Sequence, residues 1–318
     1  MPDALRHPAA LLVLAAACWG TGTAISKQAV ADVPPVTLLT IQLAASLVFL
    51  AIVARLRGAN LRAGAADGPI VRLGLLNPGL SYALGLLGLT QISASLSVLI
   101  WALEPIGIMA LAVVLLSERP TVRLVALSTL AVAGLVVVLY DPAAGGEAAG
   151  IAISAAGVAC CALYTIAARA WVRGSESTVR VVFGQEAFAL VFAVGLDALV
   201  WSAGGAVAPV TVTVGLATSA IVSGLLYYGL AYWLYLNALR SLPASVAATS
   251  FYLIPIFGLA AAAVYGERLA LVQWTGAAVV LVALAGIALS SAPSSGMLGD
   301  PLVKPRVSPT RPAQDLSD

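Results

Sequence analysis

Ten apolar stretches of about 20 residues follow one another along this chain of 318 residues. The hydrocarbon core of a bilayer is about 30 Å thick and a helix rises 1.5 Å per residue, so each stretch is long enough to cross it. Only 9% of the residues are charged, against about 25% in a typical soluble domain. The pattern predicts an all-α integral membrane protein with ten transmembrane helices. The predicted spans are 8–30, 35–54, 70–90, 93–116, 122–140, 148–168, 179–201, 216–239, 243–265 and 269–290.

The segments between these stretches are short and rich in turn residues, which leaves no room for a soluble catalytic domain. Residues 1–8 are expected to form a polar N-terminal tail. Residues 291–318 are rich in Pro and Ser and are expected to form a disordered C-terminal tail. The spans between the tails fall into a first half, 9–140, and a second half, 148–290.

The basic residues alternate with the spans and predict an orientation. With a cytoplasmic N-terminus, fourteen of the sixteen Lys and Arg residues fall on the cytoplasmic side, and only Lys27 and Arg268 face outward. A missing or extra span near the middle would destroy this asymmetry. The positive charges therefore support ten spans with both termini cytoplasmic.

An internal repeat connects the two halves. Residues 93–119 resemble residues 243–268, with Pro105 matching Pro255 and Glu118-Arg119 matching Glu267-Arg268. If each half holds five spans, the odd number turns the second half upside down relative to the first. Two inverted repeats with a binding site between them near the midplane are a transporter architecture.

The order and spacing of several short motifs resemble the EamA-type family of drug/metabolite transporters. The resemblance covers about residues 9–290. In the first half it is carried by Trp19-Gly20, Lys27, Pro34-Pro35, Ser93-Ala94-Ser95, Pro105 and Ser117-Glu118-Arg119. In the second half it is carried by Leu163-Tyr164-Thr165 through Arg169, by Leu242 to Ser245, by Pro255 and by Gly266-Glu267-Arg268.

The resemblance implies ten transmembrane helices in two EamA repeats, cytoplasmic termini, a location in the plasma membrane and export of small solutes such as amino acids or related metabolites. The expected mechanism is secondary active transport by alternating access. Broad efflux of drugs or organic cations on the same fold is the alternative. The chain departs from the family pattern at Cys160-Cys161, where a tryptophan is common, and by carrying Glu104 directly before Pro105.

Glu104 is the main candidate for binding or coupling, because an ionisable group inside a bilayer is costly and usually functional. Counted from Ser93 at 1.5 Å per residue, it lies about 16 Å deep in a helix that Pro105 is expected to kink. Its carboxyl is a counter-ion for a substrate ammonium, a protonatable relay, or a neutral group hydrogen-bonded to other helices. Trp101 lies three residues earlier, on the same face of that helix.

Glu186 and Lys27 are the other charged candidates within spans. Glu186 lies about 10 Å from the inner end of its span, where it faces either the same cavity or a neighbouring helix. Lys27 lies near the outer end of the first span. It either reaches the headgroups or pairs with Glu104 or with a substrate carboxylate.

Aromatic residues within spans are candidates for packing against an amphiphilic substrate. The group consists of Trp19, Trp101, Tyr227, Tyr228, Tyr232 and Tyr252, although interfacial belts and ordinary helix packing also account for such rings.

The residue types exclude several other functions. The sole histidine, His7, lies in the N-terminal tail, and the three cysteines lie in apolar stretches without ligand spacing, so we expect no metal site and no cofactor. A nucleophile with its base, paired catalytic aspartates and a nucleotide-binding loop are missing, so we expect no enzyme. The expected partners are a small-molecule substrate and the lipid bilayer, without nucleic acid, and proton coupling through a carboxyl is one alternative. The oligomeric state and the coupling ion stay open.

Overall fold

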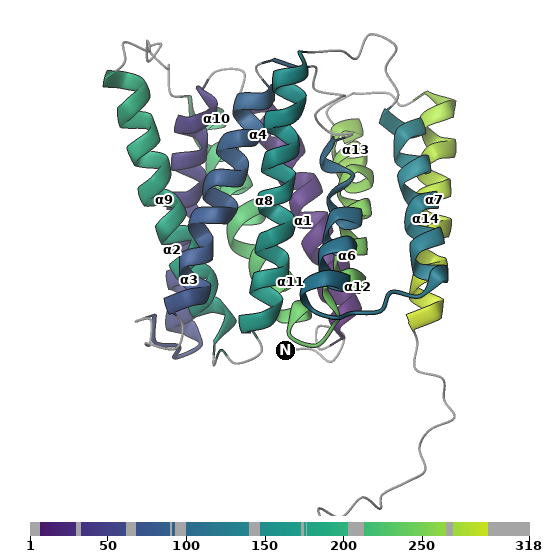
Figure 1. Ribbon diagram of the computed structural model, residues 1–318. Helices are drawn as coiled ribbons and strands as arrows, with labels where there is room; N and C mark the ends of the chain where they lie inside the picture. Colours follow the sequence, from purple (N-terminus) through teal and green to yellow (C-terminus); the bar gives the residue numbers. More distant parts are fainter. Residues whose placement is uncertain are drawn as a thin grey trace, which may run out of the picture.

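The structure is a computed structural model that describes residues 7–29, 33–61, 68–89, 91–92, 100–139, 147–172, 175, 177–202, 213–264 and 270–291. The regular elements in these ranges are helices, most of which stand side by side in an upright bundle (Figure 1). The predictions for the two tails lie almost entirely outside the described residues. The all-α prediction is confirmed for the described part of the chain.

Within the described residues, five helices are long and apolar enough to cross a membrane. They are α1 (Pro8–Ala29), α2 (Pro35–Leu56), α8 (Ala148–Val172), α9 (Thr178–Ser202) and the continuous run of α10 (Val214–Gly224), η4 (Leu225–Leu230) and α11 (Ala231–Leu239).

Shorter helices account for the rest of the bundle. They are α3 (Gly68–Gly74), η3 (Leu75–Leu80), α4 (Ser81–Leu89), α6 (Glu104–Leu115), α7 (Val122–Leu139), α12 (Ala244–Ala248), η5 (Thr249–Leu253), α13 (Ile254–Val264) and α14 (Leu271–Ser291). The chain is therefore a multi-pass helical membrane protein. The count of ten spans stays a prediction.

The helices pack in a pattern that the two halves share. α2 packs against α9, and α7 packs against α14. α1 lies against α10, α11 and α13 of the second half, while α8 lies against α3, α4 and α6 of the first half. In Figure 1 the pair α7 and α14 stands at one side of the bundle and α9 stands at the other. Each half thus contributes one helix that packs against several helices of the other half.

Two glycines allow the halves to cross closely. Gly74 ends α3 so near to Gln185 of α9 that a Cβ would collide with the Gln185 carbonyl group. Gly224 ends α10 beside Gln42 of α2, where a Cβ would lie 2.5 Å from the Gln42 carbonyl oxygen. Each glycine comes directly before an irregular segment, the kinked η3 or the π-helical η4. The same kind of contact between the halves therefore occurs twice, with the glycine once in the first half and once in the second.

Glu118 links the two halves at one end of the bundle. Ser117, after α6, has a positive φ of 54°, which turns the chain back. The Glu118 carboxylate then accepts hydrogen bonds from the backbone N–H of Ala244 at 2.8 Å, from the N–H of Ser245 at 3.1 Å and from the Ser245 hydroxyl at 2.6 Å. A carboxylate at a helix N-terminus satisfies backbone donors that have no partner within the helix. This contact fixes the start of α12 to the first half of the chain.

Replacing Glu118 with alanine is expected to lower the thermal midpoint of the protein in detergent. Hydrogen bonds to a charged group contribute roughly 1.5–3 kcal/mol each when they are well protected. Glu118 is only partly buried, so we expect a loss of about 1–3 kcal/mol in total. The matched control is Arg119→Ala, which changes the exposed neighbouring residue. Equal midpoints for the two variants would contradict a stabilising role for the Glu118 contact.

Candidate functional site

A cavity of about 380 Å³ lies between the two halves of the bundle. Its walls come from α1, η3, α4, α6, α8, η4, α11, η5 and α13, so both halves contribute to it. Eight of the lining residues are aromatic: Trp19, Tyr82, Trp101, Tyr164, Tyr227, Tyr232, Tyr235 and Phe251. The side chains of Thr23, Asn77, Glu104, Cys161 and Thr165 add polar groups to the wall.

Irregular backbone surrounds the cavity. Asn77, inside η3, has the extended conformation φ −150° and ψ 124°, and Pro78 follows it. Residues 102–103 form a turn before α6, and Thr249–Leu253 forms the 3₁₀ segment η5. Broken helices at membrane depth are tolerated where the backbone is buried in protein or lines a cavity. The interruptions therefore lie where the fold opens space for a ligand.

The aromatic rings form two adjoining groups. Tyr82 stacks on Trp101 with ring centroids 5.7 Å apart and planes 19° from parallel. Gly85 of α4 gives the Trp101 ring its space, because a Cβ on Gly85 would lie 2.9 Å from that ring. Trp19 meets Tyr232 and Phe251 edge to face at 5.3 and 5.4 Å. Rings held in this way present large apolar surfaces and little freedom to move.

Hydrogen bonds fix the tyrosines around the cavity. The Tyr82 hydroxyl donates to the Tyr227 hydroxyl at 2.9 Å, which joins α4 to η4. The Tyr232 hydroxyl donates to Asn77 Oδ1 at 3.1 Å, and the Ser81 hydroxyl donates to the same oxygen at 2.7 Å. The wall is thus a connected polar network on an aromatic frame. In contrast, the indole Nε1 of Trp19 is buried without a hydrogen-bond partner in the described structure.

Glu104 is the only carboxylic acid among the described residues that line the cavity, and none of these residues is Lys, Arg or His. It is the first residue of α6 and is followed by Pro105 at the start of that helix. Proline is well accepted in the first turn, where its missing N–H has no helical partner, and a carboxyl there suits the helix dipole. The expected kink beside Pro105 has a counterpart in the structure, because the helical residues 100–101 are followed by a turn at 102–103 and α6 begins at Glu104.

The structure brings three of the predicted site residues together. Glu104, Trp101 and Trp19 all line the cavity, and Trp101 and Glu104 reach it from either side of the turn at 102–103. Their assignment to substrate binding or coupling stays a proposal. Lys27 lies in α1, but its side chain lies outside the described part of the chain, so its pairing with Glu104 also stays a prediction.

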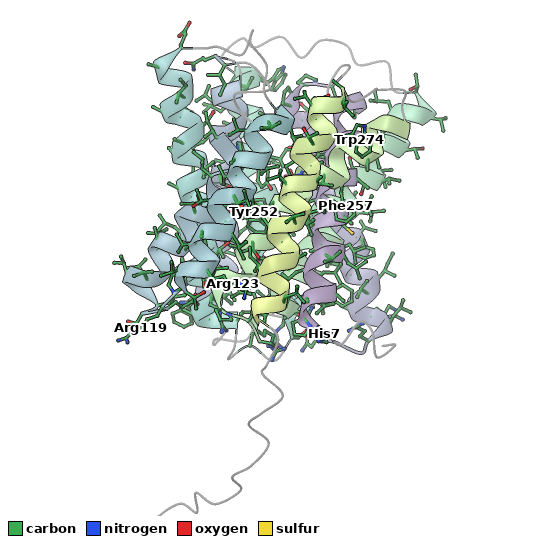
Figure 2. The ribbon with its side chains drawn as sticks, turned by 90° about the vertical axis from the view of Figure 1, so that its right-hand side faces the viewer. His7, Arg119, Arg123, Tyr252, Phe257 and Trp274 are labelled. Atoms are coloured by element: carbon green, nitrogen blue, oxygen red, sulfur yellow. The ribbon has the colours of Figure 1, made fainter. Side chains whose placement is uncertain are left out.

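Two predicted aromatic residues lie elsewhere. Tyr228 is buried behind the cavity wall, where its ring is parallel to that of Tyr232 at 6.5 Å. Tyr252 is fully buried among Ala131, Leu135, Val280 and Ala283 of α7 and α14; Figure 2 shows its position along the bundle. The prediction that Tyr252 faces the cavity is therefore corrected. In the 3₁₀ segment η5 it is the preceding residue, Phe251, that lines the cavity.

Glu186 is not among the described residues that line the cavity. It is 1% exposed in α9, and its carboxyl interacts electrostatically with the tyrosines Tyr164 and Tyr228. Tyr164, one of these two tyrosines, does line the cavity. The interpretation that Glu186 faces the same cavity as Glu104 is therefore corrected, and a role in coupling stays open to proposal.

Sequence analysis missed several residues of the wall. Tyr82, Tyr164 and Tyr235 line the cavity although only Tyr164 appeared in a motif. The sequence did contain a signal for these residues, because each is a tyrosine within an apolar span and a buried phenol needs a hydrogen-bond partner.

Among the described residues, no group of three or more His, Cys, Asp and Glu side chains could hold a metal ion.

Comparisons with known proteins agree with the repeat found in the sequence. A sequence model described as the EamA-like transporter family matches residues 8–140 and again residues 148–289. Twenty-eight solved chains are similar to this one. One of them, a crystal structure, is 19% identical in sequence, has a TM-score of 0.74, and matches 88% of this chain and 96% of its own. At this identity the likeness concerns the fold alone. No curated protein matches the sequence.

Proposed function

The chain belongs to the EamA-like transporter family, and from this premise we propose that it is a secondary active transporter that exports a small organic metabolite through the central cavity. The family places it among membrane transporters of the drug/metabolite superfamily and gives it two EamA repeats, 8–140 and 148–289. We propose amino acids or related amine-bearing metabolites as the substrates. The observation that carries this proposal is an aromatic cavity between the two repeats in which Glu104 is the one carboxyl among the described lining residues.

The proposed topology is ten transmembrane helices in two inverted five-helix repeats, with both termini cytoplasmic in the plasma membrane. Five spans per repeat invert the second repeat, and the excess of basic residues at one end supports the orientation. Figure 2 shows His7, Arg119 and Arg123 toward one end of the bundle and Trp274 nearer the other. Rocking of one repeat against the other would expose the cavity to each side in turn.

The chemistry of the cavity supports a substrate with a protonated amine. The Glu104 carboxylate is the natural partner for an ammonium group in a site of low polarity, and the surrounding rings pack against an apolar or aromatic body. Aromatic faces also attract cations directly. A volume of about 380 Å³ suits a solute of metabolite size, within the usual range of roughly 300–1,000 Å³ for ligand pockets.

Efflux of organic cations is the second candidate, and one observation favours it. An amino acid brings a carboxylate as well as an ammonium, yet the described wall contains no basic side chain to receive it. Lys27 would have to supply that charge for amino acids, whereas a cation needs only Glu104 and the rings. The two candidates therefore differ in their dependence on Lys27.

Flux into proteoliposomes tests both candidates. We would compare labelled phenylalanine, labelled leucine and labelled benzyltrimethylammonium, with and without a pH gradient, for the wild type and for Lys27→Ala. Saturable phenylalanine flux that Lys27→Ala reduces at least tenfold is expected for an amino-acid carrier. Flux of benzyltrimethylammonium alone, unaffected by Lys27→Ala, would favour cation efflux. If none of the three is carried, the proposed substrate classes are wrong.

A further inference from the structure

The protein contains a second buried carboxyl, Glu186, outside the substrate cavity. Both of its oxygens are buried and have no hydrogen-bond partner among the described residues. We propose that Glu186 binds and releases the proton that couples transport to the proton gradient, at a site separate from the substrate carboxyl Glu104. This inference rests on the proposed transport function.

The surroundings of Glu186 are phenols and apolar helix surfaces. α9 packs against α2, α3, η3, η4 and α11. The side-chain amide of the neighbouring Gln185 makes its hydrogen bonds elsewhere. It accepts one from the Tyr164 hydroxyl at 3.0 Å and donates one to the Ile70 carbonyl at 2.9 Å. Tyr164 of α8 and Tyr228 of η4 are close enough to Glu186 for an electrostatic interaction. The other titratable or charged groups on the described parts of α2, α3 and α11 are Arg55, Arg72, Tyr232 and Tyr235.

Such a site suits the protonated form of a carboxyl in the conformation described here. A buried carboxylate anion without hydrogen bonds is strongly unfavourable, whereas the acid is neutral. If the repeats rearrange and water reaches α9, the O–H bond of Glu186 breaks and water takes the proton, which leaves a solvated carboxylate. Protonation from the opposite side of the membrane restores the acid. One proton thus crosses for each cycle, without any other reactant.

Tyr164 connects this site with the cavity. Tyr164 lines the cavity and also interacts electrostatically with Glu186. Its hydroxyl donates a hydrogen bond to Gln185, the residue before Glu186 in α9. A substrate that displaces the Tyr164 ring would therefore disturb the packing around Glu186. Since the two carboxyls occupy different sites, an ammonium at Glu104 and a proton at Glu186 do not compete for one group. The arrangement separates substrate recognition from energy coupling.

Glu186→Gln in proteoliposomes tests this separation, because glutamine keeps the shape and cannot ionise. The probe is labelled phenylalanine or labelled benzyltrimethylammonium, whichever the wild type carries. Counterflow exchange without a pH gradient is expected to stay within about twofold of the wild type, while accumulation driven by a pH gradient falls to the equilibrium level. Glu104→Gln is expected to lose both. Gradient-driven accumulation by Glu186→Gln, or loss of counterflow in the folded variant, would overturn the proposal.

Two further measurements keep the test independent of a single variant and of the substrate. Glu186→Asp retains an ionisable group and is expected to accumulate the probe against its gradient; loss of accumulation with counterflow intact would overturn the proposal. The infrared spectrum of the wild-type protein in detergent at neutral pH is expected to contain a C=O band of a protonated carboxylic acid that Glu186→Gln lacks. This band can be measured without transport, so its absence refutes the proton site on Glu186 even if the protein carries neither probe. Absence of flux alone refutes only the proposed function.

Discussion

Glu104→Gln is expected to reduce substrate flux by at least roughly 30-fold at a subsaturating concentration. The change removes the only carboxylate in the described cavity wall while it keeps the size of the side chain. Loss of one partner from a buried, hydrogen-bonded charge pair costs about 2–5 kcal/mol, and 1.4 kcal/mol corresponds to a factor of ten. The measurement is initial uptake into proteoliposomes with matched amounts of folded protein.

Glu147→Gln is the matched control for this prediction. Glu147 is exposed directly before α8, so the same chemical change there removes one negative charge far from the cavity wall. Its flux is expected to equal that of the wild type. A Glu104→Gln variant that transports at the control rate would show that the carboxyl neither pairs with the substrate nor takes part in transport, and would leave it a neutral packing group.

The choice of Glu104 as a candidate was possible from the sequence, because a charged residue inside an apolar stretch is rare and costly in a bilayer. A glutamate in the middle of an apolar stretch stands out without any knowledge of helix orientation. Trp101 and Trp19 lie in the same cavity and were also among the predicted residues. The local structure at Glu104 was not predictable in the same way, since a proline within an apolar stretch fits both a kinked helix and the start of a new one.

The tyrosines of the eighth predicted span show why the finer assignment fails. Sequence analysis named Tyr227, Tyr228 and Tyr232 as candidates without a helix phase to separate them, whereas Tyr227, Tyr232 and Tyr235 line the cavity. Adjacent residues of an α-helix differ by about 100° in direction, so an error of one position changes the face. The π-helical segment η4 adds a residue to its turn and rotates α11 relative to α10 about the helix axis. Periodicity read across such a segment therefore gives the wrong face.

The same argument applies to Tyr252, which lies in the 3₁₀ segment η5 and points to α7 and α14, while Phe251 takes the cavity position. Neither irregular segment has a clear sequence signature. The gross fold, in contrast, rests on the total length and polarity of each stretch, which one shifted residue does not change. Helical class and repeat structure were therefore predictable, and the side of each helix that faces the cavity was not.

Gly224→Val is expected to prevent or strongly reduce accumulation of folded protein. An added Cβ would lie 2.5 Å from the carbonyl oxygen and 2.7 Å from the Cα of Gln42, which are backbone atoms and cannot rotate away. Overpacking a closely packed site typically costs about 1–3 kcal/mol, and valine adds two methyl groups beyond the Cβ. Since Gly74 makes the corresponding contact with Gln185, Gly74→Val is expected to have an effect of the same kind. The measurement is the monodisperse yield in detergent and the thermal midpoint.

Gly195→Val separates this contact from the general effect of valine in a helix. Gly195 lies in α9, and a Cβ added there would meet nothing within 4 Å. The substitution therefore changes the intrinsic helix propensity as Gly224→Val does, but it displaces no neighbouring atom. We expect wild-type yield and a midpoint within a few degrees of the wild type. If Gly224→Val and Gly195→Val behave alike, the close crossing of α10 with α2 does not hold the repeats together. If only the two contact glycines fail, the paired crossings beside η3 and η4 hold the repeats in the arrangement that encloses the cavity.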